Sequence, residues 1–235
     1  MIHDTAYNAP MPDPGTDALS PLARDIIKAA AYEKLLAPSR ATSLANELLS
    51  AVTPDQLLTV PVTSYPNTYA MLAGLWLWHD GLHECHEIVQ KSPEKFAGAR
   101  RNSSLNVLTA ESAETESGKS RQKLRHATAT FAFWHAIMHR REGDFSNSKY
   151  WYAHADGHSI LPSIGVHVGT AINHLPADKS LLRVVRGGWD PDAFVDLVQD
   201  VSARRDDPRL ATVVAIQRIE WQMLFDHCTR EAGGG

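Results

Sequence analysis

Residues 68–90 read TYAMLAGLWLWHDGLHECHEIVQ and form the most apolar part of the chain, and residues 122–141 read QKLRHATATFAFWHAIMHRR. Each stretch has the pattern of a helix whose apolar stripe continues into histidines. His79, His83 and His86 stand at i, i+4 and i+7, which places them within an arc of about 60°. His135 and His139 stand at i and i+4. We therefore expect both histidine stripes to point into the protein.

Further helices are indicated by residues that commonly start them. Ser20-Pro21, Asp190-Pro191 and Asp207-Pro208 have the order of an N-cap followed by a first-turn proline. Together with apolar periodicity they predict helices over about 21–36, 41–52, 191–204 and 208–231. No stretch alternates apolar and polar residues as a half-buried strand does. We therefore predict an all-α protein, an antiparallel helical bundle of about six to nine helices.

The domain organisation expected from the sequence is simple. A chain of 235 residues has the length of one domain. We place a single helical domain over 18–231, after a proline-rich, flexible N-terminal tail over 1–17. Residues 109–121 are polar and lack an apolar anchor, so we expect a mobile loop there.

Composition and missing motifs exclude several classes of protein. The chain has 23 basic and 27 acidic residues and a net charge of −4, which argues against a nucleic-acid binder. No apolar run reaches the roughly 20 residues of a membrane span, and the N-terminus does not resemble a signal peptide, so we expect a cytoplasmic protein. The two cysteines cannot build a disulfide framework or a zinc ribbon. Walker, GxSxG, GxGxxG and HExxH motifs are absent from the sequence.

The two histidine stripes predict a shared metal site. Imidazole is a preferred ligand of transition metals, and helical bundles build metal sites from facing helices. We expect the two helices to pack so that the stripes converge on a divalent transition metal, zinc or iron. The candidate ligands are His79, His83, His86, His135 and His139. Two other interpretations stay open: histidines that line a polar pocket without metal, and histidines that are purely structural.

A charged motif follows the second stripe. Residues 139–144 read HRREGD, and the cations could simply favour a helix C-terminus. Arginine near a metal is also a common way to hold phosphate or carboxylate. We predict that an anionic substrate group is bound by Arg140, Arg141 and Lys149, with Trp134, Tyr150 and Trp151 either as walls of the pocket or as core residues. The expected general bases, or groups that orient the ligands, are Asp80, Glu142 and Asp144.

The segments LWLWHDGLHECH and FWHAIMHRREGDFSNSKYWYAHADGH, with the ending IQRIEWQMLFDHC, resemble a family of uncharacterised bacterial and fungal proteins. The resemblance covers about residues 70–230 and rests on the Trp-His-Asp and His-Arg-Arg-Glu-Gly-Asp-Phe-Ser-Asn segments. It implies no activity. It does imply that an acidic residue can replace His83 and that the connection over 91–125 is longer here than in relatives.

The function that these features predict is a metal-dependent enzyme acting on a small anionic molecule that carries a phosphate, diphosphate or carboxylate. The reaction could be that of a hydrolase, a lyase or cyclase, or an isomerase. Two alternatives stay open. One is a helical protein that binds haem or another small ligand, with paired histidines as axial ligands. The other is a non-catalytic structural protein.

Overall fold

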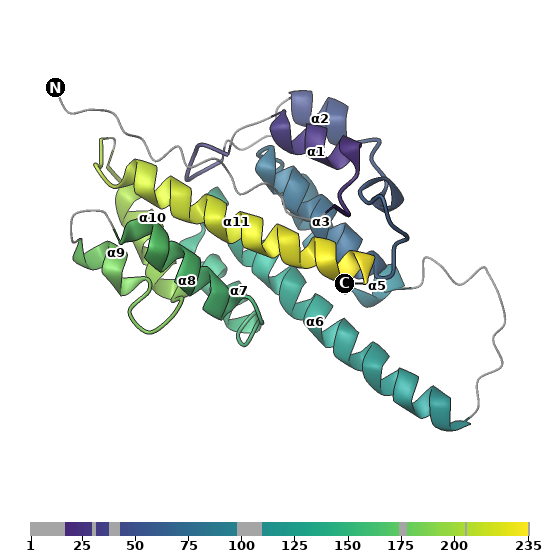
Figure 1. The fold of residues 1–235 in the computed structure, drawn as a ribbon. Coiled ribbons are helices and arrows are strands. Elements are labelled where there is room, and N and C mark those ends of the chain that lie inside the picture. The colour runs from purple at the N-terminus through teal and green to yellow at the C-terminus, as the bar shows by residue number, and fades with distance from the viewer. Residues whose placement is uncertain are drawn as a thin grey trace.

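The computed structural model describes residues 17–29, 32–37, 43–97, 110–173, 178–204 and 206–234. These residues form eleven α-helices and one short 3-10 helix, and they include no strand, which confirms the all-α helical bundle (Figure 1). The helices outnumber the six to nine expected because several are single turns that the sequence pattern does not resolve. No helix among the described residues is both long and apolar enough to cross a membrane. The expected tail over 1–17 lies, apart from Asp17, outside the described residues.

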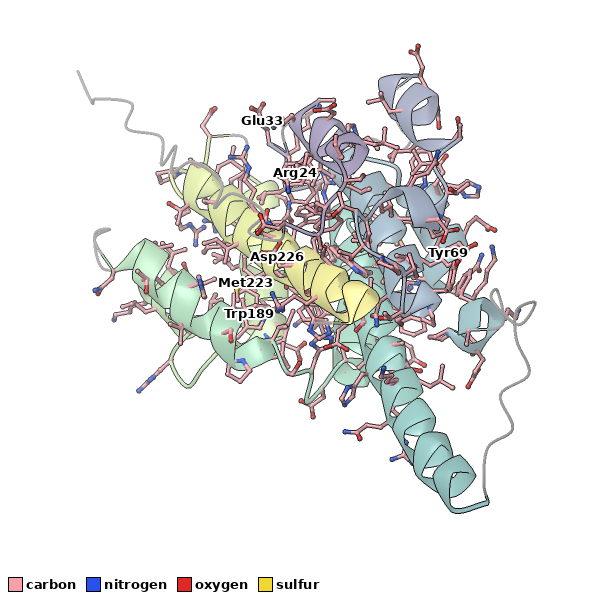
Figure 2. The ribbon with its side chains drawn as sticks, turned by 45° about the vertical axis from the view of Figure 1, so that its right-hand side comes forward. Arg24, Glu33, Tyr69, Trp189, Met223 and Asp226 are labelled. Atoms are coloured by element: carbon pink, nitrogen blue, oxygen red, sulfur yellow. The ribbon has the colours of Figure 1, made fainter. Side chains whose placement is uncertain are left out.

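The centre of the bundle is built by α3 (Tyr65–Trp78), α6 (Ala110–Glu142) and α11 (Leu210–Gly233). Figure 1 shows α6 and α11 running in opposite directions, and Figure 2 shows side chains filling the space around them. Trp134 of α6 and Trp221 of α11 are fully buried. Gly74 permits this packing, because a Cβ there would lie 2.8 Å from the Trp134 ring. The Trp221 indole N–H donates to the Gly74 carbonyl at 2.8 Å, which ties α11 to α3.

The remaining helices surround this centre. They are α1 (Pro21–Lys28), α2 (Ser43–Leu49), α4 (Leu82–Val89), α5 (Glu94–Ala97), α7 (Phe145–His154), α8 (Leu161–Ile172), α9 (Lys179–Arg183) and α10 (Pro191–Ser202), with the 3-10 helix at Pro54–Gln56. Ser20 and Asp190 cap α1 and α10 as their sequence pairs predict. α1 ends at Lys28, well before the expected residue 36. Asp207 is not the N-cap of α11, which begins at Leu210.

The predicted single helix over 68–90 is wrong, because the chain breaks between α3 and α4. Asp80 adopts a φ of +64°, a left-handed conformation that Asp tolerates better than most residues. Gly81 donates its N–H to the Trp76 carbonyl at 2.7 Å, which closes the end of α3. A Cβ at Gly81 would lie 2.6 Å from the Trp76 ring, so the tight turn requires glycine. His79 therefore does not share a helical face with His83 and His86.

The predicted loop over 109–121 is also wrong for the residues that the structure describes. α6 begins at Ala110, so residues 110–121 form the first third of a 33-residue helix, which extends beyond the neighbouring helices in Figure 1. Residue 109 lies outside the described residues. The segment contains Ala, Glu, Lys and Arg, which favour helix, and Glu116 and Lys119 stand three residues apart, a spacing at which opposite charges stabilise a helix. Polarity alone therefore does not distinguish a loop from a helix here.

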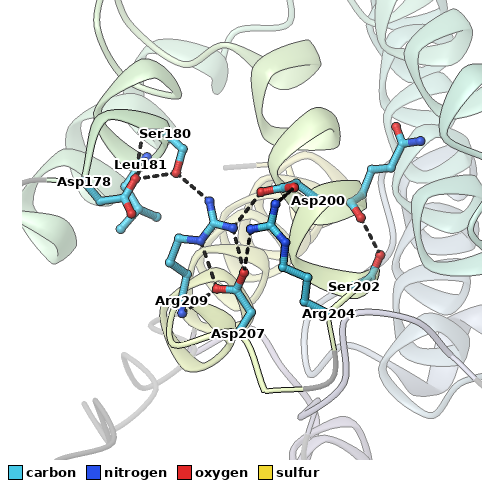
Figure 3. Close-up of polar contacts among 9 residues, drawn as sticks. Asp178, Ser180, Leu181, Asp200, Ser202, Arg204, Asp207 and Arg209 are labelled. Atoms are coloured by element: carbon cyan, nitrogen blue, oxygen red, sulfur yellow. Dashed lines mark hydrogen bonds and ion pairs between the residues drawn. The ribbon is translucent and has the colours of Figure 1, made fainter.

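A polar network joins α9, α10 and α11 on the other side of the bundle (Figure 3). The Arg209 guanidinium donates to Asp207 and Asp200, both at 2.6 Å, and to the Ser180 hydroxyl at 2.9 Å. Asp178 caps α9 by accepting from the Ser180 N–H at 2.8 Å. Arg204 adds an ion pair with Asp200 at 2.7 Å. These contacts fix the short helix α9 against the start of α11.

Candidate metal centre

Three histidines from two helices meet in the structure. His86 lies on α4, and His135 and His139 lie on α6. Each offers one ring nitrogen, and these nitrogens lie within 4.8 Å of one another. Ring centroids are 4.9 Å apart for His86 and His135, 4.8 Å for His135 and His139, and 5.8 Å for His86 and His139. The two sequence stripes thus meet at three of the five predicted ligands. We call these three residues the histidine triplet.

His135 is the most unusual member of the triplet. The side chain is buried, and neither ring nitrogen has a hydrogen-bond partner among the described residues. The ring stacks on Trp151 of α7 at 3.9 Å, with an angle of 16° between the planes. Burial, with smaller contributions from the nearby His139 and His86, lowers the pKa of His135 to about 3. His135 is therefore neutral at physiological pH and has a lone pair available for an electrophile.

His139 has neighbours at both ring nitrogens. Nδ1 lies 3.0 Å from Oε2 of Glu142, one turn later on α6. Nε2 lies 3.0 Å from Nδ2, the side-chain amide nitrogen, of Asn147 on α7. A carboxylate that orients a histidine is the usual partner of a metal-bound imidazole. Asn147 was not among the predicted site residues, and the only sequence signal for it is its place just after the Asp144 cap.

A pocket of about 390 Å³ opens beside the triplet. It is lined by Ala37, Leu82, His83, His86, Met138, His139 and Glu142. His86 is half-buried, and its pKa is lowered mainly by burial and next by His139. His83 is exposed on α4, so it lines the pocket without joining the triplet. The pocket gives a small molecule access to two of the three histidines.

His79 is not part of this site, and its predicted role as a ligand is corrected. The residue ends α3, and its Nε2 lies 2.9 Å from the Ile26 carbonyl of α1. Because the chain breaks at Asp80, the His79 ring takes part in the contact between α3 and α1. The prediction failed because it continued a helical stripe across a turn.

Arg140 does not reach the pocket, contrary to the sequence expectation. Its side chain is fully buried and forms an ion pair with Glu220 of α11. It also donates to the Tyr152 hydroxyl, which in turn donates to Glu220 at 2.6 Å. Its guanidinium carbon lies 4.6 Å from the centre of the Phe194 ring. Arg140 is a core residue that joins α6, α7 and α11.

Arg141 is also buried and is directed to the other side of α6. It donates to the Leu77 carbonyl and to the Asp80 carboxylate, both at 2.6 Å. Its guanidinium carbon lies 4.1 Å from the centre of the Tyr32 ring. Arg141 and Asp80 therefore hold the turn between α3 and α4, which corrects both the substrate-binding role of Arg141 and the catalytic role of Asp80.

The other predicted pocket residues also have structural positions. Lys149 forms an ion pair with Asp196 of α10 at 2.6 Å, and Asp144 caps α7 by accepting from the Asn147 N–H at 3.1 Å. Tyr150 is 55% exposed, and Trp134 is buried in the core. None of the four lines the pocket beside the triplet. Trp151, next to Tyr150, is the aromatic residue that touches the site.

The remaining described histidines outside the triplet differ in environment. His154 and His167 are exposed, and each places Nδ1 near a carbonyl of its own helix. His158 is buried, with Nε2 3.1 Å from the Thr130 hydroxyl and Nδ1 accepting from the Ile160 N–H at 3.4 Å. The centroids of the His158 and His227 rings lie 4.7 Å apart. His174 lies outside the described residues.

Comparisons with known proteins do not extend this description. No family model, curated protein sequence or solved structure matches the chain. The fold therefore defines a class, an all-α helical bundle, and a function has to come from the geometry of its side chains.

Proposed function

We propose that the protein is a metal-dependent enzyme that acts on a small anionic molecule, with a single divalent ion held by His86, His135 and His139. The observation that carries this proposal is His135, whose two buried nitrogens have no partner among the described residues. A buried polar group without a partner costs about 1–3 kcal/mol. A metal ion bound to one nitrogen would offset that cost, and the nitrogens of His86 and His139 stand close enough to share the ion.

The donor set suits zinc or iron. Nitrogens bound at about 2.1 Å to one tetrahedral ion lie about 3.4 Å apart. The triplet nitrogens, within 4.8 Å of one another, would close in by an ångström or so. Asn147 would give up its place at Nε2 of His139, or Glu142 its place at Nδ1. Three protein ligands leave a further position, and the pocket lies beside His86 and His139.

The chemistry follows from the ion and from one carboxylate. A divalent ion acts as a Lewis acid and makes water a nucleophile near neutral pH. Glu142 can orient the His139 ring, and because its side chain is half-exposed in the pocket wall, it can also accept a proton from the reacting group. These features favour a hydrolase over the other reaction classes.

Binding of an anionic substrate would require positive charges other than those of the three cations that the sequence suggested. Arg140, Arg141 and Lys149 are engaged elsewhere. Positive charge at the pocket would come from the ion itself, which His86 and His139 of the pocket wall would help to hold. A pocket of about 390 Å³ suits a small molecule and is too small for a polymer chain.

The alternatives fit the geometry less well. The rings of His86 and His135 meet edge to face with centroids 4.9 Å apart, which leaves no slot for a planar haem between them. Structural histidines are expected to have partners at their nitrogens, as His158 does. His135 has none among the described residues.

Metal analysis of protein purified without a histidine tag tests the proposal. We expect about one zinc or iron per chain, and a large loss of metal in His86→Ala and in His135→Phe, which keeps the stack on Trp151. His167→Ala is the matched control, since His167 is exposed and lies on α8. Wild-type protein without bound metal after loading, or triplet variants with wild-type metal content, would overturn the metal centre.

An activity screen then tests the enzyme. Metal-loaded wild-type protein is assayed against phosphate monoesters, diphosphates, carboxylic esters and amides, and His135→Phe serves as the inactive control. Hydrolysis that needs both the metal and the triplet supports the proposal. Metal binding with no turnover on any of these classes would contradict an enzyme and leave a metal-binding protein.

A further inference from the structure

A second pocket lies on the segment between α9 and α10, which is a different part of the chain from the histidine triplet. Its volume is about 580 Å³, and it is lined by Arg183 and by residues 186–191. The sequence there reads RGGWDP. Apart from Asp190 and Pro191, which start α10, none of these residues was assigned a role by the sequence analysis, and none has a part in the proposed function.

Neither arginine of this pocket is paired with a carboxylate that the structure describes. Arg183 and Arg186 are exposed, and neither guanidinium group forms a hydrogen bond or ion pair with a residue that the structure describes. Arginines nearby behave differently: Arg209 binds Asp200 and Asp207, and Arg204 binds Asp200 (Figure 3). Asp200 and Asp207 are thus paired with Arg204 and Arg209, while Arg183 and Arg186 line the pocket without an ion pair to a described residue.

The pocket wall also contains an unused donor. The indole Nε1 of Trp189 is buried and has no hydrogen-bond partner among the described residues. Trp189 itself is 9% exposed and packs on Phe194, with ring centroids 5.1 Å apart. A buried N–H group without an acceptor is uncommon and calls for one.

The loop that carries these groups is held in place. Asp190 donates its N–H to the Val184 carbonyl at 2.9 Å, and Gly188 donates to the Val185 carbonyl at 3.3 Å. Gly188 has a φ of +114°, which favours glycine. Gly165 of α8 lets the backbone of Trp189 approach, because a Cβ there would lie 2.7 Å from its nitrogen. The donors are therefore pre-positioned, which lowers the entropic cost of binding.

The acidic residue of the pocket is already engaged. Oδ1 of Asp190 accepts from the Ala193 N–H at 2.9 Å, as the N-cap of the 12-residue helix α10. Its charge is stabilised by the helix N-terminus, which itself favours anions. Positive charge and N–H donors therefore dominate the pocket.

We propose that this pocket, which we call the α9–α10 site, binds one anionic group, a phosphate or a carboxylate of a small molecule. The guanidinium groups of Arg183 and Arg186 supply charge and paired donors, and the Trp189 indole supplies a further N–H. This site does not rest on the proposed metal centre, because it shares no residue with it.

Titration of ¹⁵N-labelled protein with inorganic phosphate tests the site. Ionic strength is held constant with chloride, because screening alone shifts exposed charges. Sodium acetate is titrated in parallel to separate a carboxylate site from a phosphate site. We expect saturable shifts of the Trp189 indole N–H and of the Gly187 and Gly188 amides with at least one of the two anions. The indole signal is assigned by its loss in Trp189→Phe.

Variants distinguish a built site from general charge effects. Arg183→Ala/Arg186→Ala should weaken binding roughly tenfold or more while leaving the melting temperature unchanged, because both side chains are exposed. Trp189→Phe should weaken it by a smaller factor. Arg125→Ala on α6 removes an equally exposed arginine elsewhere and should have no effect.

Two results would overturn the α9–α10 site. The first is that neither phosphate nor acetate produces saturable shifts at the loop. The second is that the variant with both Arg183→Ala and Arg186→Ala binds the anion as tightly as the wild-type protein and the Arg125→Ala control do. Neither result depends on metal content. The proposal of the α9–α10 site can therefore be contradicted while that of the metal centre is supported, and the metal centre can be contradicted while the α9–α10 site is supported.

Discussion

The last turns of α6 present two polar faces that differ in how far their groups are satisfied. One face carries His135 and His139, which meet His86 beside a pocket. Arg140 and Arg141, which follow His139 directly in the sequence, lie in the core. We refer to these two arginines together as the arginine face, and to His135 and His139 as the histidine face. Both terminal nitrogens of Arg140 have partners, Glu220 and Tyr152, and only its Nε has none among the described residues. His135 has no partner at either nitrogen among the described residues.

This difference teaches where function is to be sought. Charge attracted attention to the arginines, yet their charges are used to join helices. His135 is uncharged at neutral pH, because burial holds its pKa at about 3. Its unpaired nitrogens, close to two histidines that line a pocket, are the better sign of a binding site, since native proteins rarely bury polar atoms without partners. We expect mutations on the arginine face to affect stability and mutations on the histidine face to affect metal binding.

The largest effect is expected on the arginine face. Glu220→Ala leaves the Arg140 charge buried without its partner, which should lower the free energy of unfolding by about 3–5 kcal/mol. Urea denaturation measures this loss. Asp196→Ala is the control, because it breaks the half-exposed pair with Lys149 and should cost less than about 1 kcal/mol. Equal losses in the two variants would show that the buried pair is not special.

The next effect is expected on the histidine face. Glu142→Gln removes the carboxylate beside Nδ1 of His139, which should weaken zinc binding by about ten- to a hundredfold. Competition with a chromophoric chelator measures the affinity. Glu87→Gln on α4 is the control, since Glu87 is exposed and is not in the triplet or its pocket. Unchanged affinity in Glu142→Gln would remove Glu142 from the site.

A third prediction concerns pH and uses His158, a buried histidine with satisfied nitrogens. Burial lowers its pKa to about 3, and the nearby His227 and His126 act in the same direction. In the unfolded chain a histidine titrates near 6.5. As pH falls below about 6.5, the unfolded chain gains a proton that the folded chain does not bind, so stability falls by up to about 1.4 kcal/mol per pH unit.

Urea denaturation of metal-free protein at pH 7 and pH 5 checks this sign. Between these values His158 should contribute a loss of up to about 2 kcal/mol. His158→Gln should therefore show a flatter dependence on pH, whatever its stability at pH 7. The exposed His167→Ala should keep the wild-type slope. A wild-type slope in His158→Gln would mean that His158 is protonated in the folded protein.

The smallest effect is expected for Asp144, which is the N-cap of α7. Asp144→Ala removes the N-cap bond to Asn147 and should cost about 1 kcal/mol of stability. Asp144→Asn keeps a capping oxygen and should recover most of that loss. Metal content should stay unchanged in both variants. Loss of metal in Asp144→Asn would return Asp144 to the site as a functional carboxylate.

Some of these features could be predicted from sequence because they are local. The helical period of 122–141 placed His135 and His139 on one face, and the structure keeps them there. The Ser20 and Asp190 caps were visible for the same reason. The break at His79-Asp80-Gly81 was missed, although Asp-Gly is a known turn signal, because the apolar stripe seemed to continue across it. The first third of α6 was missed because its polarity was taken for a loop.

The sequence by itself determined that this protein is an all-α bundle and that His86, His135 and His139 lie on helical faces, because the 3.6-residue period is set by neighbours along the chain. It did not determine what each face meets. The tertiary structure decided that His86 joins His135 and His139 while His79 binds the Ile26 carbonyl. It also decided that Glu220, eighty residues away from Arg140 in the sequence, forms the ion pair with it. Such partners depend on how helices pack in three dimensions, and no spacing along one helix encodes that arrangement.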